Sequence, residues 1–286
     1  EVGLRKQLSM INILNPDGTL NHAAKQYEGL TMKKARARVV NDLETAGLLV
    51  QVEDRVIELA HSDRSKTPIE PYLADQWFIS MGDLAEPALE AVRKKKITIH
   101  PERYAKSYLD WLGEKRDWPV SRQLWWGHQI PIWHVSGVTR KELEDTFSEV
   151  PAVRWTPDGK EPENLEPGDW FICSANEDLG IDTINGKPLV RDPDVLDTWF
   201  SSALWPHSTL GWPEETGLIK RFYPTSTLVT SRDIITLWVA RMVILGIFNT
   251  GEIPFHHVSI HPKILDRYGE TMSKSKGNGV DPIDVI

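Results

Sequence analysis

The sequence contains a single cysteine, Cys173, among 286 residues. One thiol excludes a disulfide within the chain and a zinc site built from several cysteines. The chain also lacks positive net charge, because 33 Lys and Arg stand against 41 Asp and Glu, for a formal net charge of -8. Any surface for nucleic acid must therefore be a local basic patch and not the field of the whole molecule.

Long apolar runs are also missing, since we count none that is long enough to span a bilayer, and no secretory leader is visible. We therefore expect no membrane partner and a cytoplasmic location. Hydrophobic residues make up 40% of the chain, which is enough for a sizeable core in one large or two small domains. The chain begins with Glu1 and not with methionine, so we expect a piece of a longer protein.

Helical spacing of apolar residues predicts three helices in the first part of the chain, at 31–50, 83–96 and 102–115. Gly47 suits the end of the first helix. Short strands are predicted on either side of the turn at 15–18, and again within 54–73. Residues 134–190 are polar and rich in Pro, Gly and Glu, which predicts an insertion with little core of its own.

The last third of the chain predicts an α/β fold. "TLVTS" (227–231) and "FHHVSIH" (255–261) are strand-like, and the very apolar segment 232–248 between them is typical of a buried helix. A strand, a helix and a strand in this order form a parallel sheet. Ligands of such sheets bind at the carboxyl ends of the strands.

The polar loop "ETMSKSKGNGVDP" (270–282) follows the second of these strands. Lys274 and Lys276 offer ammonium groups, Ser273 and Ser275 offer hydroxyls, and Gly277 lets the backbone approach a ligand closely. Such a loop before a helix start is suited to phosphate. By composition alone, a solvated polar turn is the simpler interpretation.

Several long motifs carry a family resemblance. "MSKSKGN" (272–278) resembles the signature loop of the class I aminoacyl-tRNA synthetases, and "SRQLWWGHQIPIW" (121–133) and "DVLDTWFSSALWP" (194–206) resemble the valyl-tRNA synthetases more closely than the isoleucyl or leucyl ones. The resemblance implies that 1–72 is the C-terminal part of a mixed α/β editing domain. It implies that 73–286 is the second half of the Rossmann-like catalytic domain, with a polar insertion at about 134–190.

The function implied by this resemblance is a valine–tRNA ligase, which activates valine with ATP and Mg²⁺ and transfers it to tRNA(Val). Lys274 would be the catalytic residue that holds the triphosphate, and Ser273 and Ser275 would also bind ATP. Asp233 would accept hydrogen bonds from the ribose hydroxyls, although a plain helix cap is an equal alternative at this position. His261 begins the segment that passes the adenine.

Two tryptophans match motif positions that line the amino-acid pocket in the family, Trp199 in "DTWFSS" and Trp238 in "RDIITLWVARM". Rigid indoles exclude side chains larger than valine. An apolar pocket rejects the isosteric threonine only about 100-fold, which is why the family carries a hydrolytic editing site. Without the resemblance, both tryptophans would be interpreted as core aromatics.

The chain also departs from the family pattern. Thr271 replaces the first lysine of the signature loop, and Ser231 and Pro262 stand near the expected adenosine pocket, where glycines are usual. The His-x-Gly-His signature is absent, and we place His128 and Trp126 in the framework below the site. Residues 134–190 lack the paired cysteines of a zinc ribbon, and a metal on the "HHVSIH" strand has too few ligands. We therefore predict no zinc and no other metal site.

Three functions remain open. The first is a valine-activating ligase, present as a partial chain that needs the remainder of the synthetase polypeptide and is inactive by itself if the departures abolish ATP binding. The second is a non-catalytic paralogue that binds tRNA or a partner protein, for which "RKKK" and "KKARAR" offer basic side chains. The third is a remnant editing hydrolase.

Overall fold

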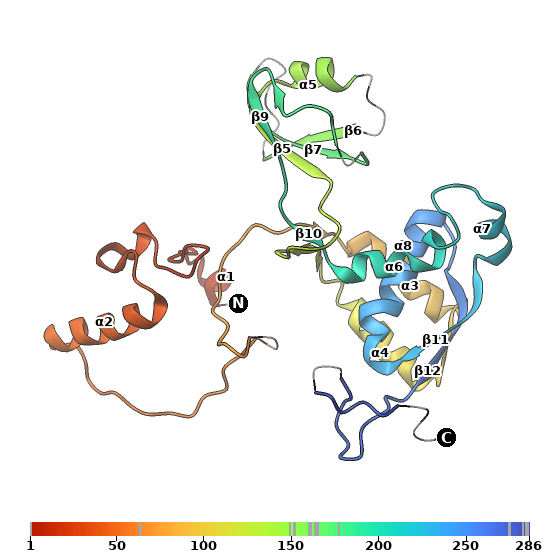
Figure 1. The fold of residues 1–286 in the computed structure, drawn as a ribbon, viewed down its shortest axis with the longest axis horizontal. Helices are drawn as coiled ribbons and strands as arrows, with labels where there is room; N and C mark the ends of the chain where they lie inside the picture. The colour runs from red at the N-terminus through yellow and green to blue at the C-terminus, as the bar shows by residue number, and fades with distance from the viewer. Residues whose placement is uncertain are drawn as a thin grey trace. The chain divides into compact units, whose positions relative to one another are not determined.

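The computed structural model describes residues 2–62, 65–148, 150, 153–159, 162, 166–176, 178–273, 276–281, 283 and 286. The chain divides into two compact units, Glu1–Asp75 and Gln76–Ile286 (Figure 1). The assignment of these parts to an editing and a catalytic domain stays a prediction.

The first unit contains one long helix. The elements are α1 (Val2–Lys6), η1 (His22–Tyr27) and α2 (Met32–Thr45). Helix α2 confirms the predicted helix, and Gly47 follows its end with a φ of 67°, a conformation that favours glycine.

The strands predicted for the first unit are wrong in its described part. The turn at 15–18 carries one isolated bridge between Leu14 and Leu20, and the segment 54–73 carries one between His61 and Pro68. Apolar side chains there face solvent, with Val56 fully exposed. A strand needs a partner to pair its backbone groups, and local sequence preference does not supply that partner.

A parallel sheet forms the core of the second unit. Strand β12 (Phe255–His261) lies between β11 (Thr225–Ser231) and β2 (Thr98–His100) and runs parallel to both (Figure 1). The pairing of β11 with β12 confirms the predicted strand–helix–strand unit and the α/β class.

Several helices share one hydrophobic core with this sheet. They include α3 (Gly82–Arg93), α4 (Arg103–Gly113) and α8 (Ala240–Thr250). Helices α3 and α4 confirm two predictions. Leu228, Val258 and Ile260 are buried in the core, whereas Val229, on the other face of β11, is 65% exposed.

The predicted buried helix between β11 and β12 is present, but it changes pitch. It begins as the 3₁₀ turn η2 (Arg232–Ile234), continues as the π-helix η3 (Ile235–Val239) and then becomes α8. The prediction that no apolar run is long enough to span a bilayer is wrong here. The described helical segment 232–250 is long and apolar enough to cross a membrane. Half of it is buried in the core, as is typical of a core helix.

Shorter elements surround this core. They are the antiparallel pairs β1 (Phe78–Ile79) with β3 (Trp118–Pro119) and β4 (Ser121–Arg122) with β10 (Val195–Leu196), and the helices α6 (Thr198–Ser208) and α7 (Gly217–Phe222).

The prediction that residues 134–190 have little core is wrong. They belong to a five-stranded antiparallel sheet in the order β6-β7-β5-β9-β8 and to helix α5. The bounds are β5 (Ile132–Val138), α5 (Arg140–Phe147), β6 (Val153–Pro157), β7 (Gly168–Ser174), β8 (Thr183–Ile184) and β9 (Lys187–Arg191).

A second hydrophobic cluster joins the strands of this sheet to helix α5. Its buried members are Trp133, Val135, Val138, Leu143, Phe147, Val153, Trp170, Ile172 and Ile184. Apolar and polar residues alternate along the strands, so the apolar side chains lie on one face of the sheet. The polar residues, which are the majority in this segment, lie on the other face and in turns. Thr139 and Glu142 form a capping box that begins α5.

A buried histidine on α6 predicts a pH effect on stability. His207 is fully buried, its Nε2 accepts from Asn249 Nδ2 at 3.1 Å, and its Nδ1 has no hydrogen-bond partner among the described residues. Burial lowers the pKa of His207. The unfolded chain therefore binds a proton below about pH 6.5 that the folded chain does not bind.

We expect the free energy of unfolding to fall as the pH drops below about 6.5, with this histidine contributing a slope of at most about 1.4 kcal/mol per pH unit. Urea denaturation between pH 7.5 and 5 measures the slope. His207→Gln should reduce it, whereas the same change at the exposed His22 should not. An unchanged slope in His207→Gln would rule out this source.

Candidate functional site

The site predicted from the sequence lies at the carboxyl edge of the parallel sheet. Strands β11 and β12 end side by side, with Ser231 paired to His261 in the parallel register. Asp233 follows β11 in the turn η2. The fold thus brings Asp233 and His261 to the same edge, where open α/β sheets bind ligands.

Asp233 has two polar partners. Its carboxylate accepts a hydrogen bond from the Ser231 hydroxyl and lies 3.1 Å from the Lys263 ammonium. These two contacts, the hydroxyl first, lower the pKa of Asp233, so the group is ionised at neutral pH. Ser231 was predicted as a departure from the family, and here it holds the carboxylate directly.

His261 also binds within its own segment. Its Nδ1 donates to the Pro262 carbonyl oxygen at 2.8 Å, which leaves Nε2 as an acceptor on an exposed ring. Further back on the same strand, His257 Nδ1 lies 3.3 Å from His100 Nε2. Within the described part of the chain, no three His, Cys, Asp or Glu side chains are grouped closely enough to hold a metal ion.

Lys274 and Ser275, the centre of the signature loop, lie outside the described residues. The flanks of the loop are held by hydrogen bonds. Asn278 accepts from the Ser273 N–H at 3.0 Å and donates to Asp266 at 2.8 Å. The bond from Asn278 is the main cause that lowers the pKa of Asp266.

Asp266 and Asn278 are residues that sequence reasoning did not single out. Asp266 lies in the turn "LDRYGE" and Asn278 in "KGN". The hydrogen bond between them spans 12 residues and is a tertiary contact. Lys276, whose ammonium group the sequence suggested for phosphate binding, pairs with Glu270 at 3.1 Å. The loop ends are therefore fixed before any ligand binds.

The two tryptophans predicted for the amino-acid pocket lie on neighbouring elements. Trp199 is on α6 and Trp238 is on the π-helix η3, and both are partly buried against the same hydrophobic core. The Trp238 indole N–H donates to the Ser202 carbonyl of α6 at 2.8 Å, and the Trp205 ring lies 6.1 Å away. π-Helical turns are rare in proteins, and many of those that occur lie at functional sites.

The framework prediction for His128 and Trp126 needs a correction. Trp126 is 90% exposed and the neighbouring Trp125 is fully exposed. His128 has an exposed side chain, and its carbonyl accepts from the Leu196 N–H at 2.7 Å. The backbone of this segment pairs with β10, whereas the side chains of Trp126 and His128 are exposed.

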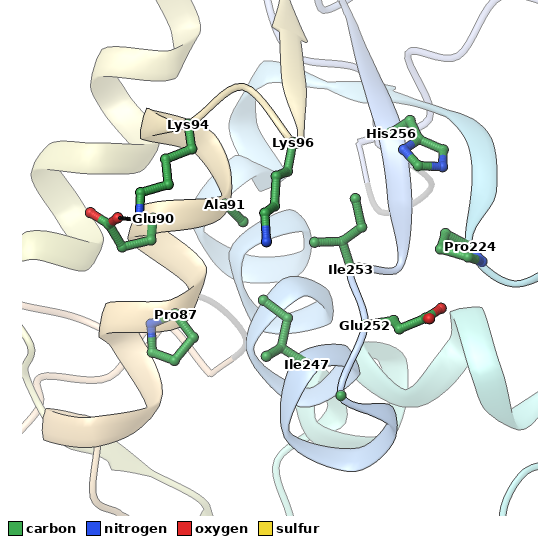
Figure 2. Close-up of a pocket in the computed structure, with 11 residues that line it drawn as sticks. Pro87, Glu90, Ala91, Lys94, Lys96, Pro224, Ile247, Glu252, Ile253 and His256 are labelled. Carbon is green, nitrogen blue, oxygen red and sulfur yellow. Dashed lines mark ion pairs between the residues drawn. The ribbon is translucent and has the colours of Figure 1, made fainter.

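A cavity of about 550 Å³ lies at the opposite edge of the sheet (Figure 2). Pro224 directly precedes β11, His256 lies near the start of β12, and Lys96 leads into β2. Lys94 there is paired with Glu90 at 2.6 Å, as the dashed line shows. Because this is the amino edge of the strands, the cavity is separate from the site around Asp233.

Comparison with known proteins gives the class. A family model described as tRNA synthetases class I (I, L, M and V) matches residues 4–286. The chain therefore belongs to the class I tRNA synthetases, and the motif-based resemblance is confirmed at this level.

Individual relatives are more specific. The chain is 59% identical over 297 residues to the valine–tRNA ligase of Rhodopirellula baltica, and 46% identical over 286 residues to that of Carboxydothermus hydrogenoformans. Both matches cover the whole chain and 29% of the relative, so the chain spans less than a third of these proteins. The solved structure of Mycobacterium tuberculosis methionyl-tRNA synthetase bound by methionyl-adenylate aligns with a TM-score of 0.46 at 18% identity, over 79% of this chain and 33% of that one.

Proposed function

We propose that this chain contributes the second half of the activating site of a valine–tRNA ligase. In that reaction a carboxylate oxygen of valine bonds to the α-phosphorus of ATP, and the bond from that phosphorus to the oxygen bridging to the β-phosphate breaks. Valyl-adenylate and pyrophosphate, which leaves with Mg²⁺, are the products, and valine then passes to tRNA(Val). The similarity to valine–tRNA ligases supports the choice of amino acid.

The observation that carries this proposal is the arrangement of Trp199 and Trp238. The hydrogen bond from Trp238 to Ser202 fixes the two helices that bear these indoles to each other. η3 directly follows the turn that holds Asp233, so Trp238 lies close in the chain to the carboxyl edge of the sheet. In this proposal the two indoles form flat apolar walls, which suit a small apolar side chain such as that of valine.

In this proposal the signature loop binds the phosphate end of ATP. Lys274 neutralises charge that grows on the leaving pyrophosphate, so its stabilisation is larger in the transition state than in the bound substrate. The hydroxyls of Ser273 and Ser275 add hydrogen bonds to the phosphate oxygens. His261 and the adjoining backbone face the adenine, although Pro262 has no N–H to donate.

Asp233 binds the ribose hydroxyls in this proposal. Its carboxylate already accepts from Ser231 and pairs with Lys263, and the side chains of Asp233 and Lys263 are 42% and 36% exposed. An exposed ion pair contributes only about 0–1 kcal/mol, so a ribose can displace the lysine at little cost. Lys263 is then free to face a phosphate.

A non-catalytic paralogue that binds tRNA or a protein partner is the second candidate. The observation that favours it is that the Asp233 carboxylate is already paired with Lys263, while Pro262 has no N–H to donate, so fewer donors and acceptors are left for adenosine. Cytoplasmic location and the absence of zinc stay predictions, and metal analysis of the purified chain tests the second of these.

The test of the proposed function is ATP–pyrophosphate exchange with valine by this chain together with the remainder of the synthetase polypeptide, because the chain alone supplies only the second half of the activating site. Exchange that depends on valine, and that isoleucine and threonine support more weakly, is the expected result. If no exchange occurs but the chain binds tRNA with a strong salt dependence, the paralogue is the correct function. Hydrolysis of threonyl-tRNA without exchange would instead identify an editing hydrolase.

A further inference from the structure

A buried charged cluster joins α6, which carries Trp199, to α8, which directly continues the π-helix that carries Trp238. Asp197, directly before α6, is 5% exposed, and Arg241, in the second position of α8, is 8% exposed. Trp118, at the start of β3, lies between them and is 4% exposed. None of these three residues was predicted from the sequence to have a role in the site.

The contacts within the cluster are directional. The Asp197 carboxylate accepts a hydrogen bond from the Trp118 indole N–H at 3.0 Å and lies 3.3 Å from the guanidinium of Arg122. The Arg241 guanidinium carbon lies 4.3 Å from the centroid of the same Trp118 ring. One indole thus receives the carboxylate at its edge and the cation at its face, which is the favoured geometry for both.

Each end of the cluster leads directly to a pocket tryptophan. Trp199 comes two residues after Asp197. The Phe200 ring, next to Trp199, lies 6.1 Å from the Trp118 ring. On the other side, Arg241 donates to the carbonyl of Leu237, the residue before Trp238, at 2.9 Å.

Stability alone does not explain the cluster. Burying charges costs free energy, and apolar residues of similar volume usually stabilise a core as well or better. Here the Arg241 Nε has no hydrogen-bond partner among the described residues, which adds to that cost. A charged hydrogen bond tolerates less displacement than apolar packing does. Directional contacts made at such a cost therefore fix the positions of the side chains and helices that they join.

We propose that Asp197 is a positioning residue for the valine pocket, which it orders through Trp118 and Arg241 by fixing Trp199 relative to Trp238. The proposal rests on the proposed function, since it assigns these two indoles to that pocket. A fixed spacing between the two walls is what excludes an additional methylene, so the cluster supports selectivity for valine over isoleucine.

Asp192 provides a matched control in the same segment of the chain. Its carboxylate accepts from the Trp77 indole N–H at 2.7 Å, the same kind of contact that Asp197 makes. Its other hydrogen bonds are to Asp194, Gln129 and Ile132, none of which is on α6 or α8. Asp192→Asn and Asp197→Asn therefore make the same chemical change at two different places.

The first experiment measures positioning without substrate. The chain is labelled with 5-fluorotryptophan, and the fluorine resonances of Trp199 and Trp238 are assigned by single Phe substitutions. Asp197→Asn should shift or broaden both resonances, and Asp192→Asn should leave them in place while moving that of Trp77. If Asp197→Asn leaves both unchanged, or if Asp192→Asn alters them equally, the proposal is wrong.

A second variant separates geometry from stability. Asp197→Asn combined with Arg241→Met removes the carboxylate together with the buried cation, so it should fold even if the single variant does not. Positioning predicts that the two resonances stay displaced in this double variant although its stability is restored. Resonances that return to their original places would show that the cluster acts on stability alone.

The third measurement connects the cluster to selectivity. The ratio of kcat/KM for valine to that for isoleucine in pyrophosphate exchange should fall about 10-fold in Asp197→Asn and stay within about 2-fold in Asp192→Asn. An equal effect in both variants overturns the proposal while the proposed function stands. If the unchanged chain shows no exchange even together with the remainder of the synthetase polypeptide, the proposed function fails, and the fluorine spectra of the chain still decide the positioning role.

Discussion

Replacing Lys274 with methionine is expected to lower valine-dependent ATP–pyrophosphate exchange on the order of 10²–10³-fold, the range typical for removal of one preorganised charge partner of a transition state. The ammonium meets negative charge that grows as pyrophosphate departs, so the loss should fall mainly on kcat and less on the KM for ATP. Methionine keeps the length of the side chain and removes the charge. Steady-state exchange kinetics at several ATP concentrations measure both parameters.

Lys276→Met is the matched control for this prediction. Lys276 lies in the same loop but pairs with Glu270 at 3.1 Å, and more than half of each side chain is exposed. Such an ion pair is screened by solvent and contributes little, so exchange should change less than about 3-fold. Equal losses in the two variants would show that the loop acts through its total charge and would exclude a specific role for Lys274.

Replacing Tyr108 with alanine is expected to lower the free energy of unfolding by about 3–5 kcal/mol, as for other large-to-small changes in a core. Tyr108 is fully buried, and its hydroxyl donates to the Ala88 carbonyl at 3.1 Å, which ties α4 to α3. Burial also raises the pKa of the Tyr108 phenol, so the hydroxyl keeps its proton at neutral pH. Urea denaturation followed by circular dichroism measures the change.

Two further variants of α4 divide this effect into its parts. Tyr108→Phe removes the hydrogen bond and keeps the ring, so it should cost about 1 kcal/mol. Tyr104→Ala, on the same helix but only partly buried, should cost clearly less than Tyr108→Ala. If Tyr104→Ala proved as damaging as Tyr108→Ala, burial at position 108 would not be the cause of the loss.

The elements that local sequence predicted correctly are those whose pattern is local. Helices α2, α3 and α4 follow from apolar residues at helical spacing, and the β11–helix–β12 unit follows from two strand-like runs around a very apolar segment. Family motifs then placed Asp233, His261 and Trp238 in the β11–helix–β12 unit, whereas Trp199 lies on α6, which was not predicted. Their roles in binding stay predictions.

The elements that local sequence missed depend on partners far along the chain. Residues 134–190 appeared too polar for a core, because strands contribute only alternate side chains and the average hides the buried half. The segment 54–73 appeared strand-like but has no strand beside it in the described part of its unit. Trp126 was predicted to belong to the framework below the site, yet its side chain is in solvent.

By itself, the sequence determined the α/β class, the order of the main elements and the membership in the class I tRNA synthetases, because periodicity and long motifs are written in consecutive residues. The tertiary structure decided which groups meet. It paired Asp233 with Lys263, joined Trp238 to Ser202, and buried Asp197 and Arg241 around Trp118. Such contacts follow from how helices and strands pack in three dimensions, and no spacing within one segment of the chain specifies them.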